Sequence, residues 1–139
     1  TPIEIAAPKP GVTVDFQRDV YPILKANCIA CHNKTTTKAD LNMETPELMK
    51  KGGESGPGLV PGKGADSIIL QAGAHTWDSV MPPKGNKVGA VNLTPQELGV
   101  LKAWIDQGAK ASEKHAQQIA WHQQIAGWGH LNLRYHLAL

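Results

Sequence analysis

Five consecutive residues combine two thiols with an imidazole at a spacing that could hold a cofactor. Cys28 and Cys31 are three positions apart, and His32 follows directly. Side chains three apart lie on the same face of a helical turn, so both thiols could add to the two vinyl groups of a haem as thioethers. C-x-x-C-H is the attachment signature of a c-type haem. His32 could then place an imidazole nitrogen on the iron as the proximal ligand.

Two cysteines at this spacing also occur in disulfides, redox pairs and zinc sites. The chain has two cysteines, so zinc would need other ligands, and the remaining histidines lie far off in no finger-like pattern. A thioredoxin-like pair would follow a strand, whereas the residues before Cys28 have a helical pattern. These comparisons favour haem, and they leave open a non-haem interaction domain with a Cys28–Cys31 disulfide.

The sixth position on such an iron separates electron carriers from enzymes and gas sensors. Methionine sulfur or a second imidazole closes it in electron-transfer cytochromes, whereas an open position permits gas binding or peroxide chemistry. Met81 is the leading candidate because the two prolines after it stiffen its loop, although it could be only an apolar gap-filler. His75 is the nitrogen candidate. Met43 and Met49 are weaker rivals, and Met49 is expected to be exposed because two lysines follow it.

A helix is expected to lead directly into the motif. Apolar residues at positions 16, 20, 23 and 24 share one face at helical spacing. Pro22 is tolerated only within the first turn, where the backbone N–H groups have no partner anyway. We therefore predict a helix from Val20 to about Asn27 with Asp19 as its N-cap, and Phe16 packing from a preceding turn.

Three further helices are predicted from their first residues. Thr45 precedes a proline, which favours the first helical position, and Asp66 or Ser67 could cap a short helix over residues 68–72. The strongest pattern opens with a capping box at residues 94–97 and continues as an apolar stripe. The expected core is therefore built from short helices.

Residues 52–64 are rich in glycine and proline, which indicates an ordered loop or an Ω-loop. Such a loop could bring its backbone close to a flat ligand, because glycine has no side chain to hold the ligand away. It could equally be a surface loop with no special role.

Composition narrows the class of protein. A chain of 139 residues is one domain by length, and its formal charge of +2 includes no basic run interleaved with aromatic residues, so nucleic-acid binding has no support. No apolar stretch approaches membrane-spanning length. Aromatic residues make up 5% of the chain. A small domain with few large side chains gains from a haem as an apolar centre.

Six stretches in order along the chain are similar to those of class I cytochromes c, and most closely to the planctomycete-type cytochrome c domain. The resemblance implies thioether links at Cys28 and Cys31, proximal His32, distal Met81 and one covalent haem c. It also implies an all-α fold of several short helices around the haem, with an N-terminal and a C-terminal helix crossing nearby. The stretches are residues 16–24, 28–32, 52–62, 67–70, 81–83 and 98–109.

The expected organisation has three parts. Residues 1–13 form a flexible N-terminal arm, and residues 14–110 form the cytochrome c domain, in which the long loop over residues 84–92 suggests a rearranged distal side. Residues 111–139 form a C-terminal helix and strand extension that matches nothing in the core pattern. That extension could begin a further domain, cover the core, make a homodimer or be an added tail. His115 and His122 would share its helical face, as a ligand pair or as surface histidines.

The expected function is that of a monohaem cytochrome, not an enzyme, carrying single electrons between redox proteins through transient contacts. The alternative is a haem enzyme or gas-sensing domain with a displaceable sixth ligand. Residues 1–12 do not resemble a signal peptide. Because covalent haem is attached outside the cytoplasm, a periplasmic or other extracytoplasmic location with a cleaved signal is expected. The domain could also have been excised from a larger multidomain enzyme.

Overall fold

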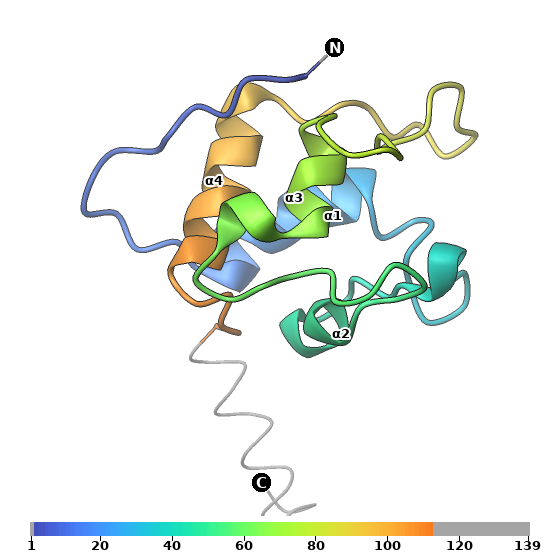
Figure 1. The fold of residues 1–139 in the computed structure, drawn as a ribbon, viewed down its shortest axis with the longest axis horizontal. Helices are drawn as coiled ribbons and strands as arrows, with labels where there is room; N and C mark the ends of the chain where they lie inside the picture. Colours follow the sequence, from blue (N-terminus) through green and yellow to red (C-terminus); the bar gives the residue numbers. More distant parts are fainter. Residues whose placement is uncertain (1, 113–139) are drawn as a thin grey trace, which may run out of the picture.

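The computed structural model describes residues 2–112, and within them the secondary structure is helical, without a β-strand (Figure 1). The all-α prediction is thus confirmed for the described part of the chain. Residues 113–139, which hold His115, His122 and most of the predicted extension, lie outside it. The elements are η1 (Phe16–Val20), α1 (Tyr21–Asn27), η2 (Lys38–Asp40), α2 (Pro46–Lys51), η3 (Gly64–Asp66), α3 (Ile68–Gly73) and α4 (Pro95–Asp106).

The longest helix, α4, is the centre of the packing. It contacts η1, η3 and α3, and Figure 1 shows α3 beside it with the N-terminal helical segment behind both. The rings of Phe16 in η1 and Trp104 in α4 have centroids 5.1 Å apart, and both side chains are buried in one apolar core. The C-terminal helix thus contacts the N-terminal helical segment through η1. A crossing of the two helices near a haem stays a prediction.

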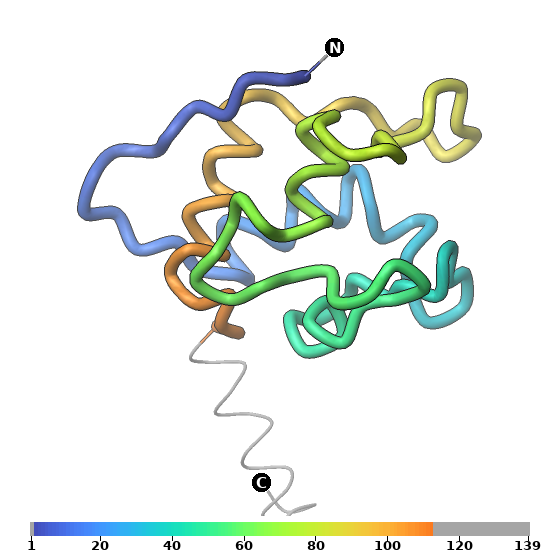
Figure 2. The backbone as a smooth tube through the Cα atoms, in the orientation of Figure 1, coloured from blue at the N-terminus to red at the C-terminus, as the bar shows by residue number. Residues whose placement is uncertain are grey.

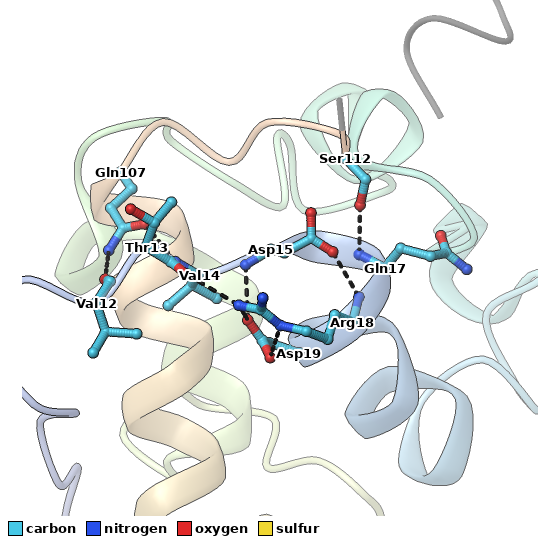
Figure 3. Close-up of polar contacts among 9 residues, drawn as sticks. All are labelled: Val12, Thr13, Val14, Asp15, Gln17, Arg18, Asp19, Gln107 and Ser112. Atoms are coloured by element: carbon cyan, nitrogen blue, oxygen red, sulfur yellow. Dashed lines mark hydrogen bonds and ion pairs between the residues drawn. The ribbon is translucent and has the colours of Figure 1, made fainter. Parts of the chain in front are cut away.

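The N-terminal helical segment starts earlier than predicted. Asp15, not Asp19, is the N-cap, and its carboxylate accepts a hydrogen bond from the Arg18 backbone N–H at 2.8 Å. The Asp19 carboxylate accepts in return from the Asp15 N–H at 2.9 Å (Figure 3). Residues Phe16–Val20 form a wider π-helical turn before the α-helix. The prediction of Asp19 as the cap was wrong because Pro22 marks the start of α1, not of the whole helical segment.

The other helix starts agree with their local signals, with one difference. Thr45 caps α2, and Thr94 and Glu97 form the predicted capping box at the start of α4. Ser67 precedes α3, but its hydroxyl makes no capping bond. The buried hydroxyl instead accepts from the Val60 N–H at 2.9 Å and donates to a backbone carbonyl at 3.0 Å, which fastens the glycine-rich loop.

The N-terminal arm passes the start of α4, bows away from that helix and returns near its end (Figure 2). It is anchored near both ends of α4. The Ala6 N–H donates to the Pro95 carbonyl at 3.0 Å. The Gln107 side chain accepts from the Val14 N–H at 2.9 Å and donates to the Val12 carbonyl at 3.0 Å. Gly99 faces the arm so closely that a Cβ there would overlap the Ala6 carbonyl. The flexibility of residues 1–13 remains a prediction, now for a segment with these anchor points.

Candidate functional site

One apolar cavity brings together the residues that the motif singled out. Cys28, Cys31, His32 and Met81 all line it. Its walls come from α1, the glycine-rich loop, α3 and the loop after Met81. The space between these walls, counted out to the open mouth and including open solvent, is about 970 Å³.

The two cysteines lie on a turn that continues from α1. The Cys28 N–H donates to the Leu24 carbonyl at 2.8 Å, and the Cys31 N–H donates to the Cys28 carbonyl at 3.2 Å. Both thiols are free. Burial, assisted by the neighbouring Cys31, raises the pKa of the Cys28 thiol to about 12. This environment disfavours a thiolate and suits an uncharged sulfur such as a thioether.

His32 is buried, with 8% of its surface exposed, and its ring is oriented by the backbone. Its Nδ1 lies 3.2 Å from the Leu41 carbonyl oxygen. A carbonyl only accepts, so this bond places the proton on Nδ1 and leaves the Nε2 lone pair available to a metal. Burial also lowers the pKa of His32, which favours the neutral form that metal binding requires.

The three methionines differ in whether they line the cavity. Met81 lines the cavity, its N–H donates to the Ala72 carbonyl at 3.0 Å, and a cis peptide bond joins it to Pro82. Met43 is buried and also lines the cavity. Met49 is fully buried away from the cavity lining, so the prediction that it is exposed was wrong. Its side chain belongs to the apolar core, whereas Lys50 is half-buried and Lys51 is exposed.

The nitrogen candidate lies outside the cavity lining. His75 follows α3 in a left-handed backbone conformation with φ of 60°, and it is not among the lining residues. Within the described residues its buried Nε2 has no hydrogen-bond partner. The cavity thus brings Met81, and not His75, together with the C-x-x-C-H motif.

Glycine backbone forms one wall of the cavity. The glycine-rich loop therefore lies at the candidate site and is not merely a surface loop. Gly53, Gly56 and Gly58 line it. A Cβ at Gly53 would overlap a backbone carbonyl, and one at Gly58 would lie 2.8 Å from the Met49 carbonyl oxygen. Side chains at these two positions would therefore force the loop out of place.

Several lining residues were not singled out from the sequence, among them Asn27, Trp77 and Asn86. Asn27 directly precedes the C-x-x-C-H motif, and this position in the sequence is the signal that could have identified it as a lining residue. Trp77 and Asn86 lie in irregular segments on either side of Met81, where apolar periodicity carries no information.

Comparison with known proteins supports the resemblance that the sequence predicts. Residues 28–85 match the family model of planctomycete cytochrome C. This match confirms the predicted resemblance to the planctomycete-type cytochrome c domain. The matched segment runs from Cys28 past Met81 and includes the glycine-rich loop, so it covers most of the cavity wall. The cofactor of a domain of this kind is covalently bound haem c, and Cys28 and Cys31 have the spacing that its attachment requires.

The search of curated proteins gave no match. Among solved structures, the chain is similar to one described as Kuenenia stuttgartiensis hydrazine synthase, with 22% sequence identity and a TM-score of 0.48. The match covers 72% of this chain and 16% of that one. The match therefore spans about a sixth of the length of that chain, and this likeness decides neither fold nor function.

The described residues fit haem c better than zinc. Two thiols on one turn, an oriented neutral imidazole and a thioether share a largely apolar cavity. Within residues 2–112, no group of three or more His, Cys, Asp or Glu side chains is arranged to hold a metal ion. The cysteine pair thus lacks, in this part of the chain, the further ligands that a zinc site needs.

Proposed function

We propose that this domain is a monohaem electron carrier in which His32 and Met81 hold the iron and Cys28 and Cys31 form the thioethers. The observation that carries the proposal is the meeting of these four side chains at one apolar cavity. They come from two segments about fifty residues apart in the sequence. The helix α3, which precedes Met81, and the segment η1, which precedes α1 and the motif, both contact α4.

The haem supplies one-electron chemistry at its iron, and the side chains of the domain set the conditions for it. The Leu41 carbonyl holds His32 in the tautomer that can bind metal. Methionine as the sixth ligand raises the reduction potential relative to a second histidine. The apolar walls exclude water, which disfavours added charge at the iron and so also affects the potential.

The partners of such a carrier are redox proteins that bind transiently, and contacts of this class are usually small. None of the helices in residues 2–112 has the length and apolar character needed to cross a lipid bilayer. We place the domain outside the cytoplasm, because c-type haem is attached there. Transfer of single electrons, without chemistry on a bound substrate, is the activity we propose.

The identity of the sixth ligand distinguishes a carrier from a haem enzyme or gas sensor. The ferric wild-type domain should show the low-spin spectrum of a six-coordinate iron, and Met81→Ala should convert it to high spin by removing the sulfur. Visible absorption of the purified haem protein measures both states. Met43→Ala is the matched control, because Met43 also lines the cavity, and it should remain low spin. An unchanged Met81→Ala spectrum, or a high-spin wild type, would rule out Met81 as the ligand.

A further inference from the structure

The loop after Met81 is held together by one side chain. The Asn86 amide oxygen accepts from the Val88 N–H at 3.2 Å and from the Ala90 N–H at 3.0 Å. Its amide nitrogen donates to the Pro83 carbonyl at 3.0 Å and the Ala90 carbonyl at 2.8 Å. Residues 83–90 therefore form one hydrogen-bonded unit, and this unit forms part of the cavity wall.

The unit is fastened to the haem-binding side by a second asparagine. The Val91 N–H donates to the Asn27 side-chain oxygen at 3.1 Å, across 64 positions of the sequence. Asn27 is the last residue of α1 and directly precedes Cys28. Its amide nitrogen is oriented by the Ile23 carbonyl at 3.4 Å.

Little else fastens this loop. In the part of the chain that the structure describes, the Asn27 bond is the hydrogen bond that joins residues 82–92 to another segment. The loop also leaves large apolar side chains in solvent, since Val88 is 49% and Val91 is 66% exposed. A segment with few buried contacts opens easily, so one cross-link can set how often it does.

We propose that Asn27 is a positioning residue that fastens the Met81 loop to the C-x-x-C-H motif and limits release of Met81 from the iron. This inference rests on the proposed His32 and Met81 ligation. The sulfur is carried at the start of the fastened loop, so loop opening and ligand release are coupled. An external ligand binds the state in which Met81 is released. The smaller the fraction of molecules in that state, the weaker the apparent affinity of the ligand.

Imidazole binding to the ferric haem protein tests the proposal. The visible absorption spectrum of the protein measures the binding. A net hydrogen bond of ordinary strength corresponds to about a 2- to 10-fold change in an equilibrium. Asn27→Ala should therefore bind imidazole about 2- to 10-fold more tightly than wild type. Asn27→Asp keeps an oxygen acceptor, so its imidazole affinity should lie close to that of the wild type. Asn92→Ala, an exposed asparagine of the same loop, is the matched control and should leave the affinity unchanged.

Removing the donor tests the same bond from its other side. Val91→Pro lacks the N–H and should raise imidazole affinity as Asn27→Ala does, and it leaves α1 intact if Asn27→Ala fails to fold. Equal affinities for Asn27→Ala, Val91→Pro and wild type, beside tighter binding by Met81→Ala, would overturn this inference and leave the proposed function standing. Wild-type binding as tight as that of Met81→Ala would instead contradict the ligation itself.

Discussion

His32, the proposed proximal ligand, illustrates how a neighbouring residue can orient a side chain for metal binding. Its own position follows from the motif, but its orientation depends on the Leu41 carbonyl nine residues later. That oxygen belongs to the backbone, so no side-chain type at position 41 reveals it. The same residue-scale logic applies to Cys28, whose buried thiol is suited to an uncharged, bonded sulfur.

Replacing both cysteines tests the covalent attachment. The Cys28→Ala, Cys31→Ala double variant retains His32 and the cavity but has no sulfur to form a thioether. Acidified organic solvent should extract the haem from this variant, whereas the haem of the wild type should stay with the polypeptide. The absorption of the two solvent phases measures the result, and haem that is extractable from the wild type would contradict the attachment.

At the scale of elements, α4 depends on a glycine in its middle. Glycine within a helix costs about 1 kcal/mol relative to alanine, so Gly99 needs a compensating role. That role is the close passage of the N-terminal arm, whose Ala6 carbonyl occupies the space of a Cβ. The arm and α4 are therefore fitted to each other, although they are far apart in the sequence.

Gly99→Ala should destabilise the full chain by about 1–3 kcal/mol, because the inserted methyl group meets backbone, which cannot rotate away. Denaturant unfolding followed by circular dichroism measures the change. Deleting residues 1–10 supplies the control, since without the arm the alanine should be neutral or stabilising by about 1 kcal/mol. Equal destabilisation with and without the arm would show that the overlap is not the cause.

At the scale of the whole molecule, Asp106 links the end of α4 to η3. Its carboxylate accepts from the Gly64 N–H at 2.7 Å and from the Lys102 ammonium at 2.8 Å. Burial raises the pKa of Asp106, but the bonds from Lys102 and Gly64 outweigh it, and the net pKa lies below the usual value. The carboxylate thus stabilises the fold above the ordinary aspartate pKa, and this contribution is lost as the pH falls through the lowered folded-state pKa.

Asp106→Asn should lower the free energy of unfolding at pH 7 by less than about 1 kcal/mol, because the pair is partly exposed. The difference from wild type should shrink as the pH falls through the lowered pKa of Asp106, where the wild-type carboxylate also loses its charge. Urea unfolding at several pH values measures it. Asp66→Asn, an exposed aspartate of η3, is the control, and a difference that grows in acid would refute the assignment.

Interactions between residues close together in the sequence could be predicted, whereas interactions between residues far apart in the sequence could not. Capping by Thr45 and Thr94 depends on neighbours within one turn, so those helix starts were predictable. The bond between Asn27 and Val91 and the fit of Gly99 to Ala6 span distant positions, and no local pattern records them. Asp19 shows an intermediate case, because Pro22 identified a helix start correctly but concealed the preceding π-helical turn.

Trp77 gives the cavity wall an optical consequence. Its indole lies among the lining residues, so light that it absorbs would pass to a haem held there and its emission would be quenched. Unfolding would carry the indole away from the porphyrin, even with the thioether bonds intact, and the protein would become brighter as it lost its structure. The wall that shields the iron would then also act as a built-in fluorescent reporter of folding.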